Sequence, residues 1–187
     1  MKVTMSHGSG GKATSDLISS IFYKNFQNSI LSQMEDSAIV SGSGTLAVTT
    51  DSFVVTPLFF PGGDIGRLSI CGTVNDLLMS GATPKYLTCG FIIEEGVPFN
   101  TLDKIAVSMK KTAEEAGVLL VAGDTKVVEG NGGLYINTSG VGFVPNGLSL
   151  GAINCKPGDA VLISGTLGEH HAAILSARMG IENSILS

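Results

Sequence analysis

Four aspartates of this 187-residue chain stand among apolar neighbours, a setting in which carboxylates usually need a partner. They are Asp36, Asp51, Asp76 and Asp124. Carboxylate oxygens are the ligands that Mg²⁺ prefers, and Mg²⁺ commonly bridges protein carboxylates to nucleotide phosphates. Because converging carboxylates repel one another unless a cation lies between them, we expect the four aspartates to meet in one pocket around Mg²⁺ and a nucleotide.

Each of these aspartates could instead have a purely structural role, and the sequence does not decide between this role and ligand binding. Asp51 and Asp124 could form turns at strand ends or cap helices. Asp76 lies with Asn75 inside a predicted helix, where aspartate has poor propensity, and such local conflicts are expected at functional sites. Lys126 follows Asp124 by two residues and would project to the same side of an extended segment. It would then bring a cation to the phosphates, unless it only balances local acids.

Residues 7–12 read His-Gly-Ser-Gly-Gly-Lys, a composition typical of a phosphate-binding loop. Glycines let backbone N–H groups converge on an anion, and Lys12 adds a positive charge. The loop does not match the P-loop pattern G-x-x-x-x-G-K-[ST]. It is not a dinucleotide-binding fingerprint either, since no predicted strand precedes it. The alternative is a flexible N-terminal segment. His7 could help to position a phosphate, whereas His170 and His171 show no metal-ligand spacing.

The composition excludes several classes of protein. Hydrophobic residues make up 43% of the chain and charged residues 14%, which indicates a packed core rather than disorder. The net charge of −5 argues against nucleic acid and anionic membrane as partners. No run approaches the roughly 18–20 apolar residues that span a bilayer, and no signal peptide is evident, so we expect a cytoplasmic protein. Cys71, Cys89 and Cys155 are too widely spaced for a disulfide framework or a zinc site, and we expect the first two in the core.

Helices and strands alternate along the chain and must position these residues. Apolar residues at helical spacing follow the glycine-rich loop, and Thr14 or Ser15 can cap that helix. Asn100 can cap a later helix, which ends near Gly117. Glycines of the last core strand are expected to mark bulges. We expect helices after residue 12 and over about 67–80, 100–117 and 168–179, with strands over 45–56, 85–93, 118–122, 136–144 and 160–164.

The chain divides at a connecting segment over 145–151, so we expect one domain over 1–150 and a second unit over 151–187. The second unit holds one predicted strand and one predicted helix, too few to bury a core of their own. We therefore expect it either to pack on the first domain or to begin a second domain that is truncated here.

Four sequence blocks carry a resemblance to a known family. They are HGSGGK at 7–12, TTDSFVVTPLFFPGGDIG at 49–66, GTVNDLLMSGA at 72–82 and AGDTKVV at 122–128. In this order they closely resemble the HypE family of hydrogenase maturation proteins, part of the PurM-like (aminoimidazole ribonucleotide synthetase) superfamily. The resemblance covers most of residues 6–178.

The resemblance implies an α+β (mixed α/β) fold. Its first part is a PurM N-terminal-like domain, a mixed sheet packed on helices whose strands join a dimer barrel. Its second part is the first strand and helix of a PurM C-terminal-like domain. The resemblance also implies ATP and Mg²⁺ as cofactors, with Asp76 and Lys126 in catalysis. The implied metal and phosphate carboxylates are Asp36, Asp51, Asp76 and Asp124, and the implied nucleotide-binding residues are His7, Gly8, Gly10, Gly11, Lys12, Thr50, Gly123, Asp124 and Lys126.

The chemistry implied by the resemblance is an ATP-dependent dehydration. A carbamoyl group on a C-terminal cysteine, a thiocarboxamide, becomes a thiocyanate that supplies the cyanide ligands of [NiFe]-hydrogenase. The implied partners are a second copy of the chain, the carbamoyltransferase HypF and the HypC–HypD scaffold. The chain ends at Ser187 without the family's terminal cysteine, so we expect it to be inactive alone. Glu169 and His171 also depart from the family's Gly-Asp-His-Gly pattern.

Two alternatives remain at this point. Thiamine-phosphate kinases and selenophosphate synthetases of the same superfamily share the TTD and ND positions, but not the PLFFPGGDIG loop. A non-catalytic dimerisation or docking module would use the hydrophobic strands and leave the carboxylates idle.

Overall fold

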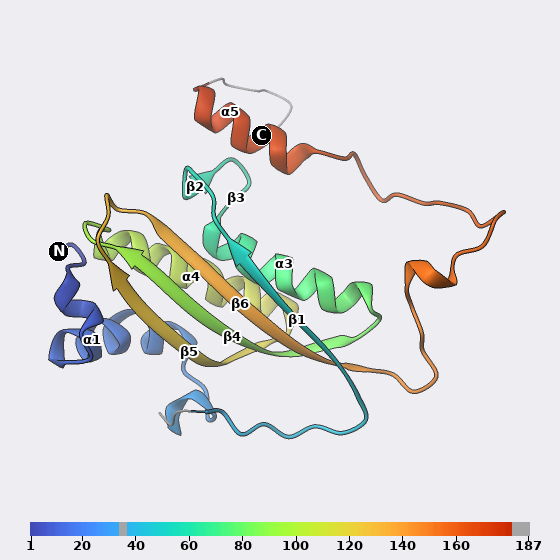
Figure 1. Cartoon of the computed structure of the whole chain (residues 1–187), viewed down its shortest axis with the longest axis horizontal. Helices are drawn as coiled ribbons and strands as arrows, with labels where there is room; N and C mark the ends of the chain where they lie inside the picture. Colours follow the sequence, from blue (N-terminus) through green and yellow to red (C-terminus); the bar gives the residue numbers. More distant parts are fainter. Residues whose placement is uncertain (34–36, 181–187) are drawn as a thin grey trace.

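The computed structural model describes residues 1–33 and 37–180, so Asp36 lies outside the described residues. Its centre is a four-stranded mixed sheet in the order β1-β6-β4-β5 (Figure 1). β6 pairs antiparallel with both β1 and β4, whereas β4 and β5 are parallel. The strands run over Thr45–Phe53 (β1), Thr83–Glu94 (β4), Leu119–Val128 (β5) and Leu134–Val144 (β6).

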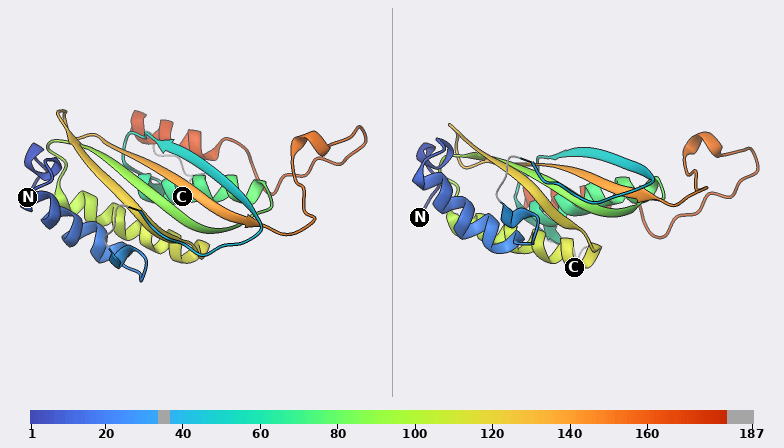
Figure 2. Two further views of the ribbon diagram at one scale, coloured as in Figure 1. Left: turned by 60° about the horizontal axis from the view of Figure 1, so that its bottom comes forward. Right: turned by 90° about the horizontal axis from the view of Figure 1, so that it is seen from below.

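Helices of the described chain lie against one face of this sheet, and its opposite face carries none (Figure 2). Helix α3, Ile65–Met79, packs on β1 and β6, and α4, Phe99–Ala116, lies beside it. The N-terminal helical segment packs on α4 and reaches the β5 edge. Apolar side chains between the two layers form one core, which includes Leu17, Ile21, Phe22, Ile70, Leu87, Phe91, Ile105, Met109 and Ile136.

The N-terminal helical segment is continuous but changes its winding. It comprises α1 (Lys12–Leu17), a π-helical stretch η2 (Ile18–Tyr23) and α2 (Lys24–Phe26). The predicted cap at Thr14 or Ser15 is wrong, since Gly11 is the N-cap. A short 3₁₀ turn, η1, precedes it over Met5–Gly8. A π-helical stretch turns side chains off the regular helical stripe, and such stretches are frequent at functional sites.

The caps of the two long helices have local causes. Asp64 caps α3, because its Oδ1 accepts hydrogen bonds from Gly66 N at 2.7 Å and Arg67 N at 3.1 Å. The predicted cap at Asn100 is wrong: α4 starts one residue before it, with Pro98 at the N-cap. Its predicted end is confirmed, since Gly117 adopts φ 67° there.

Gly140 of β6 is required by close packing rather than by a bulge. A Cβ at this position would lie 2.8 Å from Thr73 Cγ2 and 2.9 Å from Leu77 Cδ1, so α3 could not approach the sheet. The irregularity of this part of the sheet falls in β4, between Pro84 and Tyr86. The predicted bulges at the β6 glycines are therefore replaced by a bulge on the neighbouring strand.

The smaller elements lie at the ends of the sheet. A two-stranded ribbon of β2, Phe59–Phe60, and β3, Gly63–Asp64, leads into α3. Helix α5, Glu169–Met179, lies beside this ribbon, where Phe60 and His170 make an edge-to-face contact with ring centroids 5.7 Å apart (Figure 1). The remaining short 3₁₀ turns are η3, Leu31–Gln33, and η4, Ala152–Asn154.

The strand predicted over 160–164 does not form. A β-strand needs a neighbour for its backbone hydrogen bonds, and the described chain places none beside this segment. Its apolar side chains are therefore exposed, with Val161 at 92% and Leu162 at 89%. The expected helix over 168–179 is present as α5. Within the described residues, no helix is both long enough and apolar enough to span a membrane.

Candidate functional site

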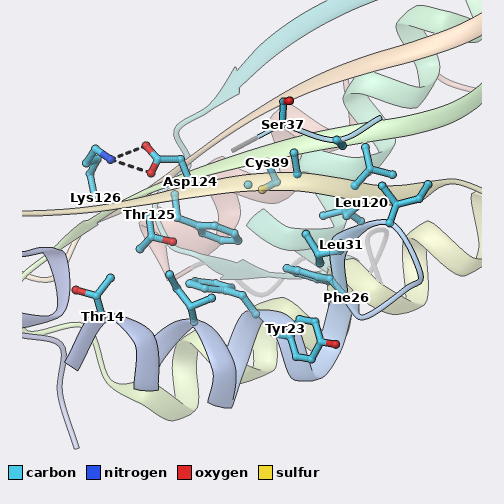
Figure 3. A pocket seen from close by; sticks show the side chains of 18 of the residues that line it. Thr14, Tyr23, Phe26, Leu31, Ser37, Cys89, Leu120, Asp124, Thr125 and Lys126 are labelled. Carbon is cyan, nitrogen blue, oxygen red and sulfur yellow. Dashed lines mark hydrogen bonds and ion pairs between the residues drawn. The ribbon is translucent and has the colours of Figure 1, made fainter. Parts of the chain in front are cut away.

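A cavity of about 370 Å³ lies between the N-terminal segment and strand β5 (Figure 3). One end is polar and is formed by the glycine-rich loop and the Asp124–Lys126 pair. The other end is apolar and lies between the π-helical stretch and the sheet. The lining residues include Gly8, Gly10, Thr14, Ile18, Phe22, Phe26, Leu31, Cys89, Phe91, Leu120, Gly123, Asp124, Thr125 and Lys126.

The glycine-rich loop packs directly on β5. A Cβ on Gly8 would lie 2.8 Å from both the backbone N and the Cβ of Val127, so only glycine allows this approach. Gly10 adopts φ 81° and donates its N–H to Thr14 Oγ1 at 3.0 Å. The loop then enters α1, whose first backbone N–H groups have no partners within the helix. Glycine backbone and a helix N-terminus therefore meet at the polar end of the cavity, an arrangement that favours an anion.

Asp124 and Lys126 form an ion pair at the same end of the cavity. Lys126 Nζ lies 2.8 Å from Asp124 Oδ1 and 2.7 Å from Oδ2 (Figure 3). The hydrogen bond from Lys126 holds the pKa of the Asp124 carboxyl below its usual value. Both side chains are about two-thirds exposed, at 67% and 64%, so water screens the pair and it contributes little stability. An anionic ligand could therefore compete for the Lys126 ammonium at small cost.

The apolar end of the cavity is lined by aromatic side chains. Phe22 of the π-helical stretch stacks on Phe91 of β4 with ring centroids 4.3 Å apart, and Phe26 lies one turn further along. Cys89 is buried at this end, and its burial raises the pKa of the thiol. This end offers an apolar lining with aromatic side chains, against which a planar ring can pack.

The sequence pattern placed Phe22 and Phe26 only on the core-facing side of a helix. Their spacing is helical, and spacing does not distinguish a side chain that fills the core from one that borders a cavity. The local signal, two phenylalanines four residues apart after a glycine-rich loop, is weak by itself. Of the cysteines, Cys89 is buried as expected, but Cys71 is only partly buried.

Four predicted nucleotide-binding residues do not line the cavity, and one of them, Gly11, is the N-cap of α1. His7 Nδ1 accepts a hydrogen bond from Thr4 N at 3.1 Å, and its ring packs on Phe99. Lys12 is exposed at the start of α1. Thr50 lies on β1, at the opposite edge of the sheet, where its hydroxyl donates to Thr138 O at 3.2 Å. The structure therefore gathers only part of the predicted set, namely Gly8, Gly10, Gly123, Asp124 and Lys126.

Asp51 and Asp76 form a second acidic site, between β1 and α3. Thr49 Oγ1 donates to Asp76 Oδ2 at 2.9 Å. Asp51 Oδ2 lies over Gly72, 3.4 Å from where a Cβ would be. Gly72 precedes Asp76 by four residues and therefore lies one helical turn away on the same face of α3, about 5–6 Å along it. The absence of a side chain at Gly72 makes room chiefly for the Phe53 ring, whose nearest atoms would lie 2.7 Å from a Cβ.

The expectation that four aspartates converge within one chain is wrong. β1 and β5 are opposite edges of the sheet, three strand spacings apart, about 14 Å. Asp51 therefore cannot share one ion with Asp124 in a single copy. The described residues contain no group of three or more histidine, cysteine, aspartate or glutamate side chains arranged to hold a metal. Two separate acidic sites exist instead.

The fold is that of the AIR synthase class of proteins. The family model for the AIR synthase related protein, N-terminal domain, matches residues 34–144, and the chain belongs to this family. Within it, the chain is similar to the carbamoyl dehydratase HypE of Escherichia coli (strain K12), with 47% identity over 99% of this chain and 58% of that protein. The expected PurM-like fold and the resemblance to HypE are thereby confirmed.

Solved structures give the same result in three dimensions. A HypE crystal structure in complex with ATP superimposes with a TM-score of 0.92 and 48% identity, covering 95% of this chain and 54% of that one. A HypE–HypF complex matches with a TM-score of 0.73 and 52% identity over 90% of this chain and 55% of the matched chain. The chain thus spans a little over half the length of these relatives.

Proposed function

We propose that this chain is the ATP-binding part of a HypE-type carbamoyl dehydratase. One observation carries the proposal. The glycine-rich loop, Lys126 and the aromatic side chains of Phe22 and Phe26 line the same cavity (Figure 3). Phosphates would bind at the loop N–H groups and Lys126, while the adenine ring would stack near Phe22 and Phe26. The likeness to a HypE structure that holds ATP supports this assignment.

The Asp51–Asp76 site fits a hard divalent cation. Asp51 lies over Gly72, which is one helical turn from Asp76 on α3, and within the described chain neither carboxylate has a lysine or arginine at salt-bridge distance. Mg²⁺ is commonly held by one or two carboxylates together with substrate phosphates. We propose that Asp51 and Asp76 hold Mg²⁺, which when bound would neutralise phosphate charge. Because the cavity of the same copy lies at the opposite edge of the sheet, about 14 Å away, this ion would meet phosphates bound by the second copy of a homodimer. Asp124, which has Lys126 as its cation, would not ligate the ion of its own copy.

The chemistry of the whole enzyme would be a phosphorylation followed by an elimination. The carbamoyl oxygen of a thiocarboxamide takes the γ-phosphoryl group of ATP and releases ADP. The C–O bond then breaks, phosphate leaves, and the nitrogen loses its protons to give a thiocyanate. Phosphorylation turns a poor leaving oxygen into a good one. The part of Lys126 would be to neutralise charge on the transferring group, and that of Asp76 to help position the metal.

The direct test is calorimetric titration of the chain with ATP in the presence and absence of Mg²⁺. We expect saturable binding that Mg²⁺ strengthens, because phosphate charge and carboxylate charge repel each other without it. A chain that only mediates docking would give no heat of nucleotide binding in either buffer, and that result would refute the proposal.

We also propose that the chain forms a homodimer through the bare face of its sheet. This face exposes apolar side chains of β1 and β4, including Val48 at 69%, Leu46 at 52% and Ile92 at 45%. Light scattering at micromolar concentration should give about twice the 19.2 kDa chain mass. A monomer mass would contradict the dimer.

The remaining partners follow from the family resemblance. We propose that the whole protein acts in the cytoplasm with the carbamoyltransferase HypF and the HypC–HypD scaffold. The matched HypE–HypF complex supports the first of these partnerships.

A further inference from the structure

Glu95, in the turn after β4, connects the glycine-rich loop to the strand beneath it. Its Oε1 accepts a hydrogen bond from Met5 N at 2.6 Å, and its own N–H donates to Val128 O at 2.9 Å. Met5 begins the η1 turn, and Gly8 at the end of that turn packs on Val127 of β5. One residue therefore holds both the loop and the end of β5.

We propose that Glu95 is a positioning residue that sets the place of the glycine-rich loop over β5 and thereby the affinity for nucleotide phosphates. Glu95 does not line the cavity, so it acts through the Met5 N–H. A hydrogen bond to a carboxylate is short and strong, and this one replaces a contact that the loop could otherwise make only with water. The inference rests on the proposed ATP site.

The backbone around Glu95 supports the same role. Val3 N donates to Val97 O at 2.8 Å, and Gly96 N donates to Val3 O at 2.9 Å. These bonds fix the chain before η1 but stop two residues short of Met5. The Glu95 side chain is therefore the attachment nearest to the loop from this turn. Without it, η1 would be held by its contact with β5 and by the packing of the His7 ring on Phe99.

The sign of the expected effect separates positioning from electrostatics. Glu95 carries a negative charge, so its removal should strengthen the binding of an anion if charge alone mattered. A positioning role predicts weaker binding of the anion, because a loop that moves away no longer directs its N–H groups at the phosphates. Glu95→Gln removes the charge but keeps an oxygen that can accept the Met5 N–H, and it should therefore bind ATP at least as well as the unmodified chain.

Glu94 provides a matched control. Its carboxylate accepts hydrogen bonds from Asn131 N at 2.7 Å, Gly133 N at 2.9 Å and the Tyr135 hydroxyl at 3.0 Å. These bonds hold the β5–β6 connection and lower the pKa of Glu94, with the bond from Gly133 as the largest cause. Glu94 makes none of its hydrogen bonds to the glycine-rich loop. Glu94→Ala therefore removes a neighbouring loop-holding carboxylate without releasing the cavity.

The experiment measures the affinity for Mg²⁺–ATP and for adenosine, by competition, in the chain and its Glu95→Ala, Glu95→Gln and Glu94→Ala variants, each checked for folding by circular dichroism. We expect Glu95→Ala to weaken ATP binding about tenfold and to leave adenosine binding unchanged, because adenosine has no phosphates. We expect Glu95→Gln and Glu94→Ala to retain ATP affinity.

Each contrary result has a distinct meaning. Equal or tighter ATP binding by Glu95→Ala would overturn the positioning role, as would equal losses in Glu95→Ala and Glu94→Ala or an equal loss for adenosine. If Glu95→Ala does not fold, Glu95→Gln is the deciding variant. A tenfold loss of ATP affinity in that variant would overturn the positioning role. Absence of ATP binding by the unmodified chain would overturn the proposed function together with this inference.

Discussion

Gly8→Val is expected to reduce the affinity for Mg²⁺–ATP by about 100-fold, the scale of loss that a displacement near 1 Å causes in a well-organised site. The reason is steric. A Cβ at this position would lie 2.8 Å from the Val127 backbone N, and a backbone atom of a paired strand cannot give way. The loop must therefore lift from β5, and its N–H groups leave the polar end of the cavity.

The measurement is a calorimetric titration with Mg²⁺–ATP, accompanied by thermal unfolding. Gly165→Val is the matched control, since a Cβ there would meet nothing within 4 Å and the residue lies outside the cavity. The control should bind ATP as the unmodified chain does. If Gly8→Val also binds normally while folded, the glycine-rich loop does not hold the phosphates.

Local sequence patterns predicted the elements well, because each pattern depends on nearby residues. The predominance of β-branched residues predicted β1, and the helices expected over about 67–80 and 100–117 agree with α3 and α4 within a few residues. The errors at the helix starts have a common cause. Several residues near a helix start can cap it, and tertiary contacts decide among them. Pro98 is the N-cap of α4 because the preceding turn is fixed by pairing with the N-terminus, where Lys2 bridges to Pro98.

Sheet order is a long-range property that no local pattern contains. β1 follows the N-terminal helices in sequence, yet it pairs with β6, the last strand, with Asp51 opposite Thr138. That pairing puts β1 and β5 at opposite edges. The sequence identified the acidic residues as candidates but could not show that the strands of Asp51 and Asp124 are opposite edges of the sheet.

The length of β5 changed the interpretation of its charged residues. The predicted strand ended at Ala122, which would have put Asp124 in a loop. The strand instead continues to Val128, because each residue from Gly123 onward pairs in register with β4. The prediction that Asp124 and Lys126 project to one side is confirmed by their ion pair, and the extended strand explains it. Polar residues lowered the apparent strand propensity of a segment whose neighbours determine its conformation.

Asp76→Asn is expected to weaken ATP binding by about 100-fold in the presence of Mg²⁺, since it removes the charge of a direct ligand, and even indirect partners of a metal contribute 10–100-fold. The fold should be unaffected, because an amide oxygen can still accept the bond that Thr49 Oγ1 donates at 2.9 Å. The same variant should bind ATP equally well or more tightly when Mg²⁺ is removed by a chelator, because one repelling charge is gone.

The decisive measurement is the ATP affinity of Asp76→Asn compared with and without Mg²⁺. Asp103→Asn removes the same charge from the helical layer, where Asp103 pairs with Lys24 at 3.5 Å, and should change neither titration. A purely electrostatic effect of net charge would alter both variants alike. A structural defect would weaken ATP binding by the same factor with and without Mg²⁺ and would lower the unfolding temperature. Only a metal ligand gives a loss that depends on the metal, so equal losses in the two buffers would remove Asp76 from the proposed Mg²⁺ site.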